Sequence, residues 1–283
     1  MAIPKVIFVG GTVRSGTSLV NVILSNQDKA MALGEIHGLI SPVMKKHVVL
    51  IDELKSHPEW SKIAVGGKAN LYKNLFRFFP DIEVFIDSSK DPLWINYHTK
   101  RLNNIADVAN ILIYKKVDSL LESFQKRGNE TFLARTYENY HKKYFKLVKK
   151  PVVISYESLI RGDETCKNAF ARLGLSFSKE RLRVTKEIKP NFFGSQRLQS
   201  NLKVDQFQLE NIKEVDEQSI EGIKLKLKEE NRYEVLKLIE RYLESQCYNT
   251  GQQKNMPTYS NFEILLIKWR DKLMNFYWGL SPR

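Results

Sequence analysis

The segment from Phe8 to Val20, FVGGTVRSGTSLV, carries the residues with the clearest chemical potential in this chain. It contains the pattern Gly-x-x-x-x-Gly-Thr-Ser, the spacing of a phosphate-binding loop, but Thr17 stands where a kinase or ATPase has lysine. A turn from a buried strand into a helix points backbone N–H groups outward, and the helix dipole favours an anion there. An ordinary turn rich in small residues is the alternative. The pattern predicts an anion site formed by Arg14, Ser15, Gly16, Thr17 and Ser18.

The missing lysine indicates which anion this loop would hold. A kinase loop uses its lysine to bridge two terminal phosphates, and a magnesium ion neutralises the charge that develops during transfer. A 5′-phosphosulfate carries less negative charge than a triphosphate, and the SO3 group that it transfers is formally neutral. Such a donor needs fewer cations and no obligatory metal ion, so that arginine, backbone amides and hydroxyl groups suffice.

Residues 13–19, Val-Arg-Ser-Gly-Thr-Ser-Leu, resemble the Pro-Arg-Ser-Gly-Thr-Thr-Leu loop of sulfotransferases that use 3′-phosphoadenosine 5′-phosphosulfate (PAPS), with valine in place of proline. Further along, residues 153–159 resemble the Tyr-Glu-Asp-Leu element of that family, and residues 170–175 resemble its Phe-Leu-Gly-Leu element. The resemblance spans roughly residues 5–200. It implies PAPS as donor, adenosine 3′,5′-bisphosphate (PAP) as product, no metal requirement and a P-loop-like three-layer sandwich.

The same family holds the 3′-phosphate of the donor with an arginine after a strand and a serine eight residues later. Lys115 takes the place of that arginine here, and Ser123 that of the serine. Lysine supplies charge without a bidentate fork, and Lys116 is the alternative if the register shifts by one. The alternative is a solvated pair of lysines at a strand end, without a binding role. Residues 191–197 resemble the loop that covers the nucleotide in this family, and a plain surface turn is the alternative. The resemblance implies that Gly194, Ser195 and Arg197 contact the 3′-phosphate.

Sulfuryl transfer to a hydroxyl needs a base for the acceptor proton and positive charge near the leaving phosphate. Residues 33–38, Leu-Gly-Glu-Ile-His-Gly, carry two candidate bases, unless both are surface residues of a loop. A Gly-Glu in this region supplies the base in many family members, which implies Glu35; His37 is the second candidate, because histidine suits base catalysis near neutral pH. Residues 87–92 resemble the Asp-Ser-Ser-Lys element of carbohydrate sulfotransferases, which implies that Lys90 assists the leaving oxygen or positions the acceptor.

Two other classes of function remain as alternatives. Asp87 could hold magnesium as in a nucleotide-dependent kinase, although the absent loop lysine favours the sulfotransferase. The formal charge of +13, from 45 basic and 32 acidic residues, favours an anionic partner. The lysines are evenly scattered and no nucleic-acid motif occurs, which argues against a basic module that binds nucleic acid.

Four apolar runs predict buried strands, at residues 5–9, 84–86, 109–114 and 151–156. They alternate with helical stretches, which indicates an α/β fold with a parallel sheet and crossover helices. In that architecture ligands bind beyond the carboxyl ends of the strands. Since residues 210–243 are charge-rich with a helical period, we expect an α/β core over residues 1–205 and a helical extension over 206–283 packed on it.

For the acceptor and the cellular location, the sequence indicates only a broad class. The Asp-Ser-Ser-Lys resemblance favours a glycan or another hydroxylated metabolite, with tyrosyl groups on peptides as an alternative. Residues 262–278 mix aromatic and basic side chains, which suits a helix in a membrane interface near lipid-linked acceptors, or one docked on the core or a second subunit. Two cysteines without metal-ligand spacing predict a cytoplasmic protein without disulfides. A strand directly at the N-terminus predicts that there is no signal peptide, and the lack of a run of about eighteen apolar residues predicts that there is no membrane span.

Overall fold

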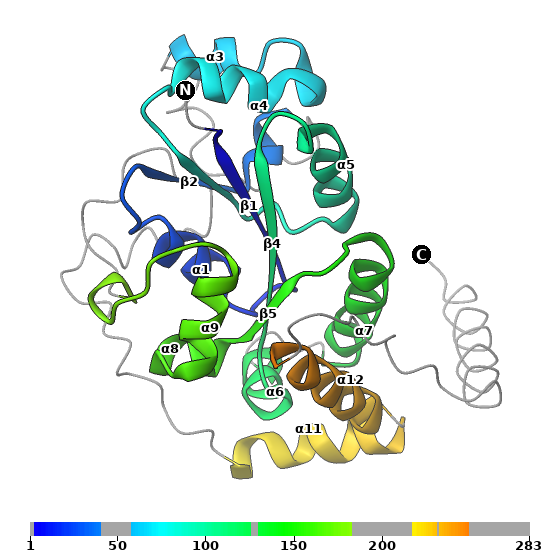
Figure 1. The fold of residues 1–283 in the computed structure, drawn as a ribbon. Helices are drawn as coiled ribbons and strands as arrows, with labels where there is room; N and C mark the ends of the chain where they lie inside the picture. Colours follow the sequence, from blue (N-terminus) through cyan, green and yellow to red (C-terminus); the bar gives the residue numbers. More distant parts are fainter. Residues whose placement is uncertain (1–2, 41–57, 126–129, 183–216, 231, 249–283) are drawn as a thin grey trace, which may run out of the picture. The chain divides into compact units, whose positions relative to one another are not determined.

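A parallel sheet of five strands forms the centre of the computed structural model (Figure 1). The structure describes residues 3–40, 58–125, 130–182, 217–230 and 232–248, all within the compact unit of residues 1–253. The strand order is β2-β3-β1-β4-β5, and every neighbouring pair is parallel. The strands are β1 (Lys5–Gly10), β2 (Ala30–Gly34), β3 (Val84–Asp87), β4 (Asp107–Tyr114) and β5 (Val152–Ser155).

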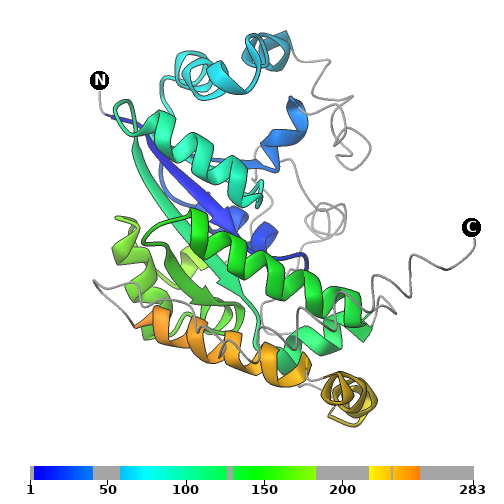
Figure 2. The same ribbon diagram turned by 90° about the vertical axis from the view of Figure 1, so that its right-hand side faces the viewer.

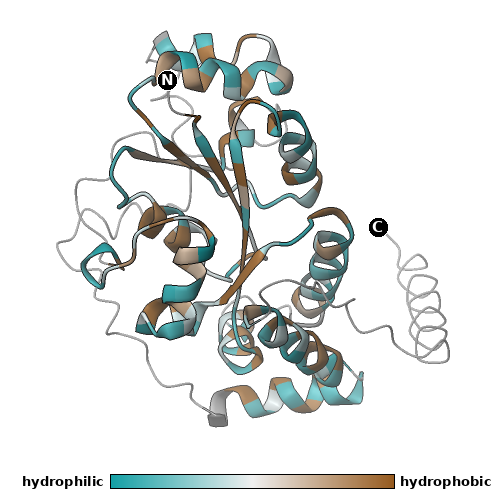
Figure 3. Ribbon diagram, viewed as in Figure 1, coloured by the Kyte–Doolittle hydropathy of each residue, from teal (hydrophilic) through white to brown (hydrophobic). Residues whose placement is uncertain are grey.

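The predicted parallel sheet is confirmed, with β2 as an additional edge strand that the apolar runs did not reveal. The central strand β1 contains Val6, Ile7, Phe8 and Val9, none of which is accessible to solvent. Figure 3 shows the strands in the hydrophobic colours, whereas the helices alternate between hydrophobic and hydrophilic residues. A strand buried on both faces needs a layer of helices on each side.

Helices cover both faces of the sheet and complete the predicted three layers. On one face, α1, α8 and α9 share a hydrophobic cluster with β1, β4 and β5. On the other, α5 packs on β1 and β4, α12 packs on β5, and α7 lies between α5 and α12 (Figure 2). The helices are α1 (Thr17–Leu24), α3 (Pro58–Ile63), α4 (Gly67–Phe78), α5 (Pro92–Leu102), α6 (Val117–Gln125), α7 (Glu130–Leu147), α8 (Tyr156–Arg161), α9 (Glu164–Arg172), α11 (Glu217–Glu229) and α12 (Arg232–Cys247), with 3-10 turns η1 (Ile36–Leu39) and η3 (Glu180–Leu182).

The last two described helices pack on the α/β core, and α12 contacts the sheet directly. Helix α11 lies against α6 and α12, and α12 lies against α7 and β5. Arg232 Nη1 of α12 is 3.1 Å from Glu138 Oε2 of α7, and only 3% and 5% of these side chains are exposed. The predicted boundary at residue 205 lies outside the described residues, so the division into core and extension stays a prediction.

Several other expectations fall on residues that the structure does not describe. These are the contacts expected from Gly194, Ser195 and Arg197 and the helix expected over residues 262–278. Within the described ranges no helix is both long and apolar enough to cross a membrane. Cys166 and Cys247 are free thiols.

The ion pair between α12 and α7 gives a test of how firmly α12 is attached. We expect Arg232→Met to lower the free energy of unfolding by about 3 kcal/mol, because it leaves the buried Glu138 carboxylate without its guanidinium. Lys142→Met is the control, since Lys142 pairs with the same carboxylate but is 41% exposed, and it should cost less than about 1 kcal/mol. Chemical denaturation measures both, and equal losses would contradict the anchoring role of Arg232.

Candidate active site

The carboxyl ends of the five strands bring the described candidate residues to one edge of the sheet. The loop of residues 11–16 follows β1, Glu35 follows β2, Lys90 lies just beyond β3, and Lys115 follows β4. Because all five strands are parallel, these segments meet where ligands bind in open α/β sheets. The edge therefore combines a candidate anion loop with candidate bases and cations.

The loop after β1 is folded so that it presents the start of α1. Ser15 donates its N–H, at 3.2 Å, and its hydroxyl, at 2.7 Å, to the carbonyl of Thr12. Gly16, the N-cap of α1, has a left-handed backbone with φ 100°, and no side-chain hydrogen bond caps the helix there. By contrast, the N-cap side chains of α8 and α9 accept hydrogen bonds from their helices. With no acidic residue in its first turn, the N-terminus of α1 suits an anion.

Arg14 connects this loop to α6. Its backbone is also left-handed, with φ 74°, and its Nε donates to the hydroxyl oxygen of Ser123 over 2.9 Å. Ser123 is buried, Thr17 is buried at the start of α1, and Ser18 beside it is partly exposed. The structure therefore puts the cation expected at the donor's 5′ end in contact with the serine expected at its 3′-phosphate.

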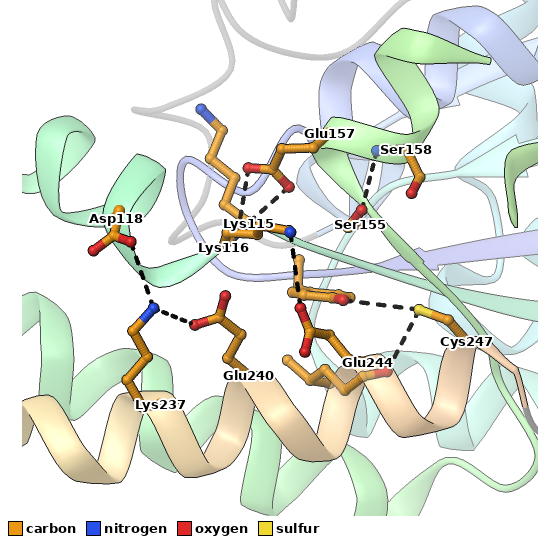
Figure 4. A network of polar contacts seen from close by, with 12 residues as sticks. Lys115, Lys116, Asp118, Ser155, Glu157, Ser158, Lys237, Glu240, Glu244 and Cys247 are labelled. Atoms are coloured by element: carbon orange, nitrogen blue, oxygen red, sulfur yellow. Dashed lines mark hydrogen bonds and ion pairs between the residues drawn. The ribbon is translucent and has the colours of Figure 1, made fainter. Parts of the chain in front are cut away.

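The two adjacent lysines after β4 point in different directions (Figure 4). The Lys116 amide donates to the carboxylate of Glu157, and Lys116 Nζ lies 3.9 Å from Glu244 Oε1 on α12. Lys115 points away from α12, and its Nζ lies 4.2 Å from the ring centroid of Tyr156. The Tyr156 ring also packs against Gly16, so Lys115 is the lysine on the side of the loop. This arrangement favours the register that assigns Lys115 to the anion site.

Glu35 and Lys90, the predicted base and the predicted assisting cation, form an ion pair with each other. About a fifth of each side chain is exposed. Lys90 has a left-handed backbone with φ 66°, which costs a residue with a Cβ atom roughly 1–2 kcal/mol. A residue with a Cβ atom keeps that conformation only where its surroundings support it.

His37, the second candidate base, lies two residues after Glu35, in η1. Its backbone N–H donates to the Ser89 hydroxyl oxygen over 3.2 Å, and its ring centroid is 6.0 Å from that of Trp94. Its Nδ1 is buried and has no hydrogen-bond partner among the described residues. The imidazole is therefore close to the Glu35 segment, but nothing in the described part of the chain orients it as a base.

Tyr140 on α7 joins the loop after β1 to the segment that carries Lys90. This residue was not identified from the sequence. Its hydroxyl accepts from the Gly11 N–H and donates to the Lys90 carbonyl, each over 2.7 Å. Tyr137, one turn earlier, donates to the Lys115 carbonyl over 3.4 Å. The spacing of Tyr137, Tyr140 and Tyr144 on one helical face is a signal in the sequence, but aromatic residues at that spacing more often only fill a core.

Comparisons with known proteins were made by sequence and by structure. No family model and no curated protein matches the sequence. The sulfotransferase domain of the olefin synthase from Synechococcus PCC 7002 matches with a TM-score of 0.51 and 18% identity, over 78% of this chain and 87% of that one. The chain has the fold of a sulfotransferase domain. This confirms the fold that the loop sequence implies.

Two further solved sulfotransferases were found. STF1 from Mycobacterium tuberculosis matches with a TM-score of 0.37 and 12% identity, over 78% of this chain and 77% of that one. A sulfotransferase from Alicyclobacillus acidocaldarius matches with a TM-score of 0.37 and 15% identity, over 75% of this chain and 100% of that one.

In this sulfotransferase fold, Asp87 is bound by protein donors. Its Oδ2 accepts from Tyr72 Oη at 2.6 Å and from Trp94 Nε1 at 2.7 Å, and its Oδ1 accepts from the Ser89 N–H at 2.7 Å. Burial raises the pKa of this carboxyl, although the hydrogen bonds from Ser89, Tyr72 and Trp94 act in the opposite direction. These three hydrogen bonds make the carboxylate an anchor for the backbone at Ser89, and they disfavour its use as the magnesium ligand of a kinase. No group of potential metal ligands occurs among the described residues.

Gly16 gives a test of the loop's shape. A Cβ at this position would lie 2.6 Å from Tyr156 Cδ2, and the left-handed backbone adds strain. We therefore expect Gly16→Ala to lower the free energy of unfolding by about 1–3 kcal/mol. Gly222→Ala in α11 is the matched control, because nothing lies within 4 Å of its added methyl group and alanine should stabilise the helix by up to about 1 kcal/mol. Chemical denaturation gives both values; a neutral Gly16→Ala would contradict the packing of this turn.

Proposed function

We propose that this chain is a sulfotransferase that moves the sulfuryl group of PAPS to a hydroxyl group of an acceptor. The observation that carries this proposal is the hydrogen bond from Arg14 Nε to Ser123 Oγ, which joins the two expected anion sites. The 5′-phosphosulfate and the 3′-phosphate of PAPS are attached to the same ribose, so a donor of this kind needs two anion sites in close proximity. The sulfotransferase fold supports the same proposal.

The donor's 5′ end would lie at the N-terminus of α1. The absence of a capping side chain and of an acidic residue in the first turn fits an anion at this position, with Arg14 beside it. Lys115 and Ser123 would hold the 3′-phosphate. Contacts from the loop of residues 191–197, through Gly194, Ser195 and Arg197, complete the proposed site. No metal ion is required in this scheme, because amides, hydroxyl groups and side-chain cations neutralise the phosphosulfate.

Glu35 acts in this proposal as the general base. It takes the proton of the acceptor hydroxyl while the hydroxyl oxygen bonds to sulfur and the bond from sulfur to the phosphate oxygen breaks. Lys90 stabilises the negative charge that develops on that departing phosphate oxygen. The ion pair between the two residues supports this scheme, because it keeps both groups within reach of one substrate. His37 is the alternative base.

The acceptor class that we propose is a glycan, including one linked to a lipid, or another hydroxylated metabolite. This rests on the resemblance of residues 87–92 to the corresponding element of carbohydrate sulfotransferases. The proposed location is the cytoplasm, with membrane contact through residues 262–278 as the route to a lipid-linked acceptor.

Calorimetric titration with PAP, AMP and ATP–magnesium tests the donor. We expect PAP to bind tightest and without magnesium, and Lys115→Ala to weaken PAP binding by about 10-fold or more, because a charge-assisted contact to phosphate is lost. Lys116→Ala is the matched control and should change PAP affinity less than about twofold, since its ammonium is directed to Glu244. Tighter binding of ATP–magnesium than of PAP would overturn the proposal in favour of a kinase.

The rate of PAP formation from PAPS, with a panel of hydroxylated acceptors, tests the base. We expect Glu35→Gln to lower this rate at least about 100-fold while PAP affinity stays unchanged, because general-base catalysis is removed without a change at the donor loop. Glu83→Gln is the control, because Glu83 forms a similar ion pair with Lys29 just before β3, at the opposite end of that strand. Retained activity in Glu35→Gln together with a loss in His37→Asn would transfer the role to His37.

A further inference from the structure

The hydroxyl of Tyr140 links the donor loop directly to the Lys90 segment. The loop side is the Gly11 N–H, which donates to Tyr140 Oη over 2.7 Å. The other side is the Lys90 carbonyl, which accepts from Tyr140 Oη over 2.7 Å. A phenol that accepts one hydrogen bond and donates another fixes the distance between the two backbones that it joins.

The two backbone groups that Tyr140 binds are at positions where the conformation is specialised. Gly11 is the first residue after β1, at the start of the anion loop. Lys90 has the left-handed conformation described above, and its side chain pairs with Glu35. Burial raises the pKa of Tyr140, so that its hydroxyl keeps the proton that it donates to the Lys90 carbonyl. A chain of contacts thus runs from Gly11 through Tyr140 and Lys90 to Glu35.

We infer that Tyr140 is a positioning residue: its hydroxyl holds the Lys90 backbone against the donor loop and transmits donor binding at the loop to the Glu35–Lys90 pair. The inference rests on the proposed function in so far as PAP is the ligand of the loop. Tyr140 itself touches neither reacting group in this scheme, and its effect on the reaction passes through Lys90.

The chain contains a matched control on the same helix, one turn away. Tyr144 has its ring stacked near that of Tyr140, with centroids 5.9 Å apart, and packs against Gly10. Its hydroxyl is buried but has no hydrogen-bond partner among the described residues. Tyr140→Phe and Tyr144→Phe therefore remove the same atom from neighbouring rings, and within the described part of the chain only the first breaks hydrogen bonds to backbone groups.

Amide hydrogen exchange and calorimetry on the full chain test the inference. In Tyr140→Phe we expect the Gly11 amide to exchange at least about 10-fold faster than in the wild type, because its acceptor is lost. We also expect PAP to shift the Lys90 amide resonance in the wild type and in Tyr144→Phe, but not in Tyr140→Phe. The affinity for PAP should change less than about threefold in both variants, since both retain Arg14, Lys115 and Ser123.

A catalytic readout separates positioning from general packing. The rate of PAP formation from PAPS should fall about 10-fold or more in Tyr140→Phe and less than about twofold in Tyr144→Phe. Persistence of the PAP-induced shift at Lys90 in Tyr140→Phe would overturn the inference, as would equal effects of the two substitutions. If the wild type fails to bind PAP, the proposed function fails, but the exchange rate of the Gly11 amide still shows whether Tyr140 holds the loop. In that case an unchanged Gly11 exchange rate in Tyr140→Phe would overturn the link as well.

Discussion

Close packing of the turn between β1 and α1 against two aromatic rings is the constraint on which the site depends. A Cβ atom at Gly10 would lie 2.3 Å from the Tyr144 ring, and one at Gly16 would lie 2.6 Å from the Tyr156 ring. These rings belong to α7 and α8, which follow β4 and β5 in the chain. The shape of the first loop therefore depends on the second half of the sheet being in place. Small residues here permit the contact, because a side chain at either position would collide with the ring.

The strand order gives the site two sides. The central strand β1 carries the loop, β4 carries Lys115 on one side of it, and β3 and β2 bring Lys90 and Glu35 to the other side. Under the proposed function the 3′-phosphate of the donor and the acceptor hydroxyl therefore lie on opposite sides of the loop that holds the phosphosulfate.

The apolar runs were enough to predict the parallel sheet and the positions of the loops, because strands buried on both faces have a strong local signal. The edge strand β2 was missed, since its sequence Ala-Met-Ala-Leu-Gly lacks the β-branched residues that mark the other strands. The pairing of Glu35 with Lys90 and of Arg14 with Ser123 could not be read from the sequence, because each pair depends on which strands become neighbours. Tyr140 could not be identified for the same reason, since its partners Gly11 and Lys90 come from two different strand ends.

The structural role of Asp87, at the end of β3, is consistent with the absence of a lysine from the loop after β1. In a nucleotide kinase such a carboxylate holds the metal ion that neutralises a triphosphate. Here its two oxygens accept from Tyr72, Trp94 and the Ser89 N–H, so the charge stabilises the segment that carries Lys90. Under the proposed function the transferred SO3 group is neutral and needs less added positive charge, which leaves the carboxylate available for this structural use. The rigid Asp87 anchor on one side and the Tyr140 link on the other then explain how Lys90 keeps its left-handed backbone conformation.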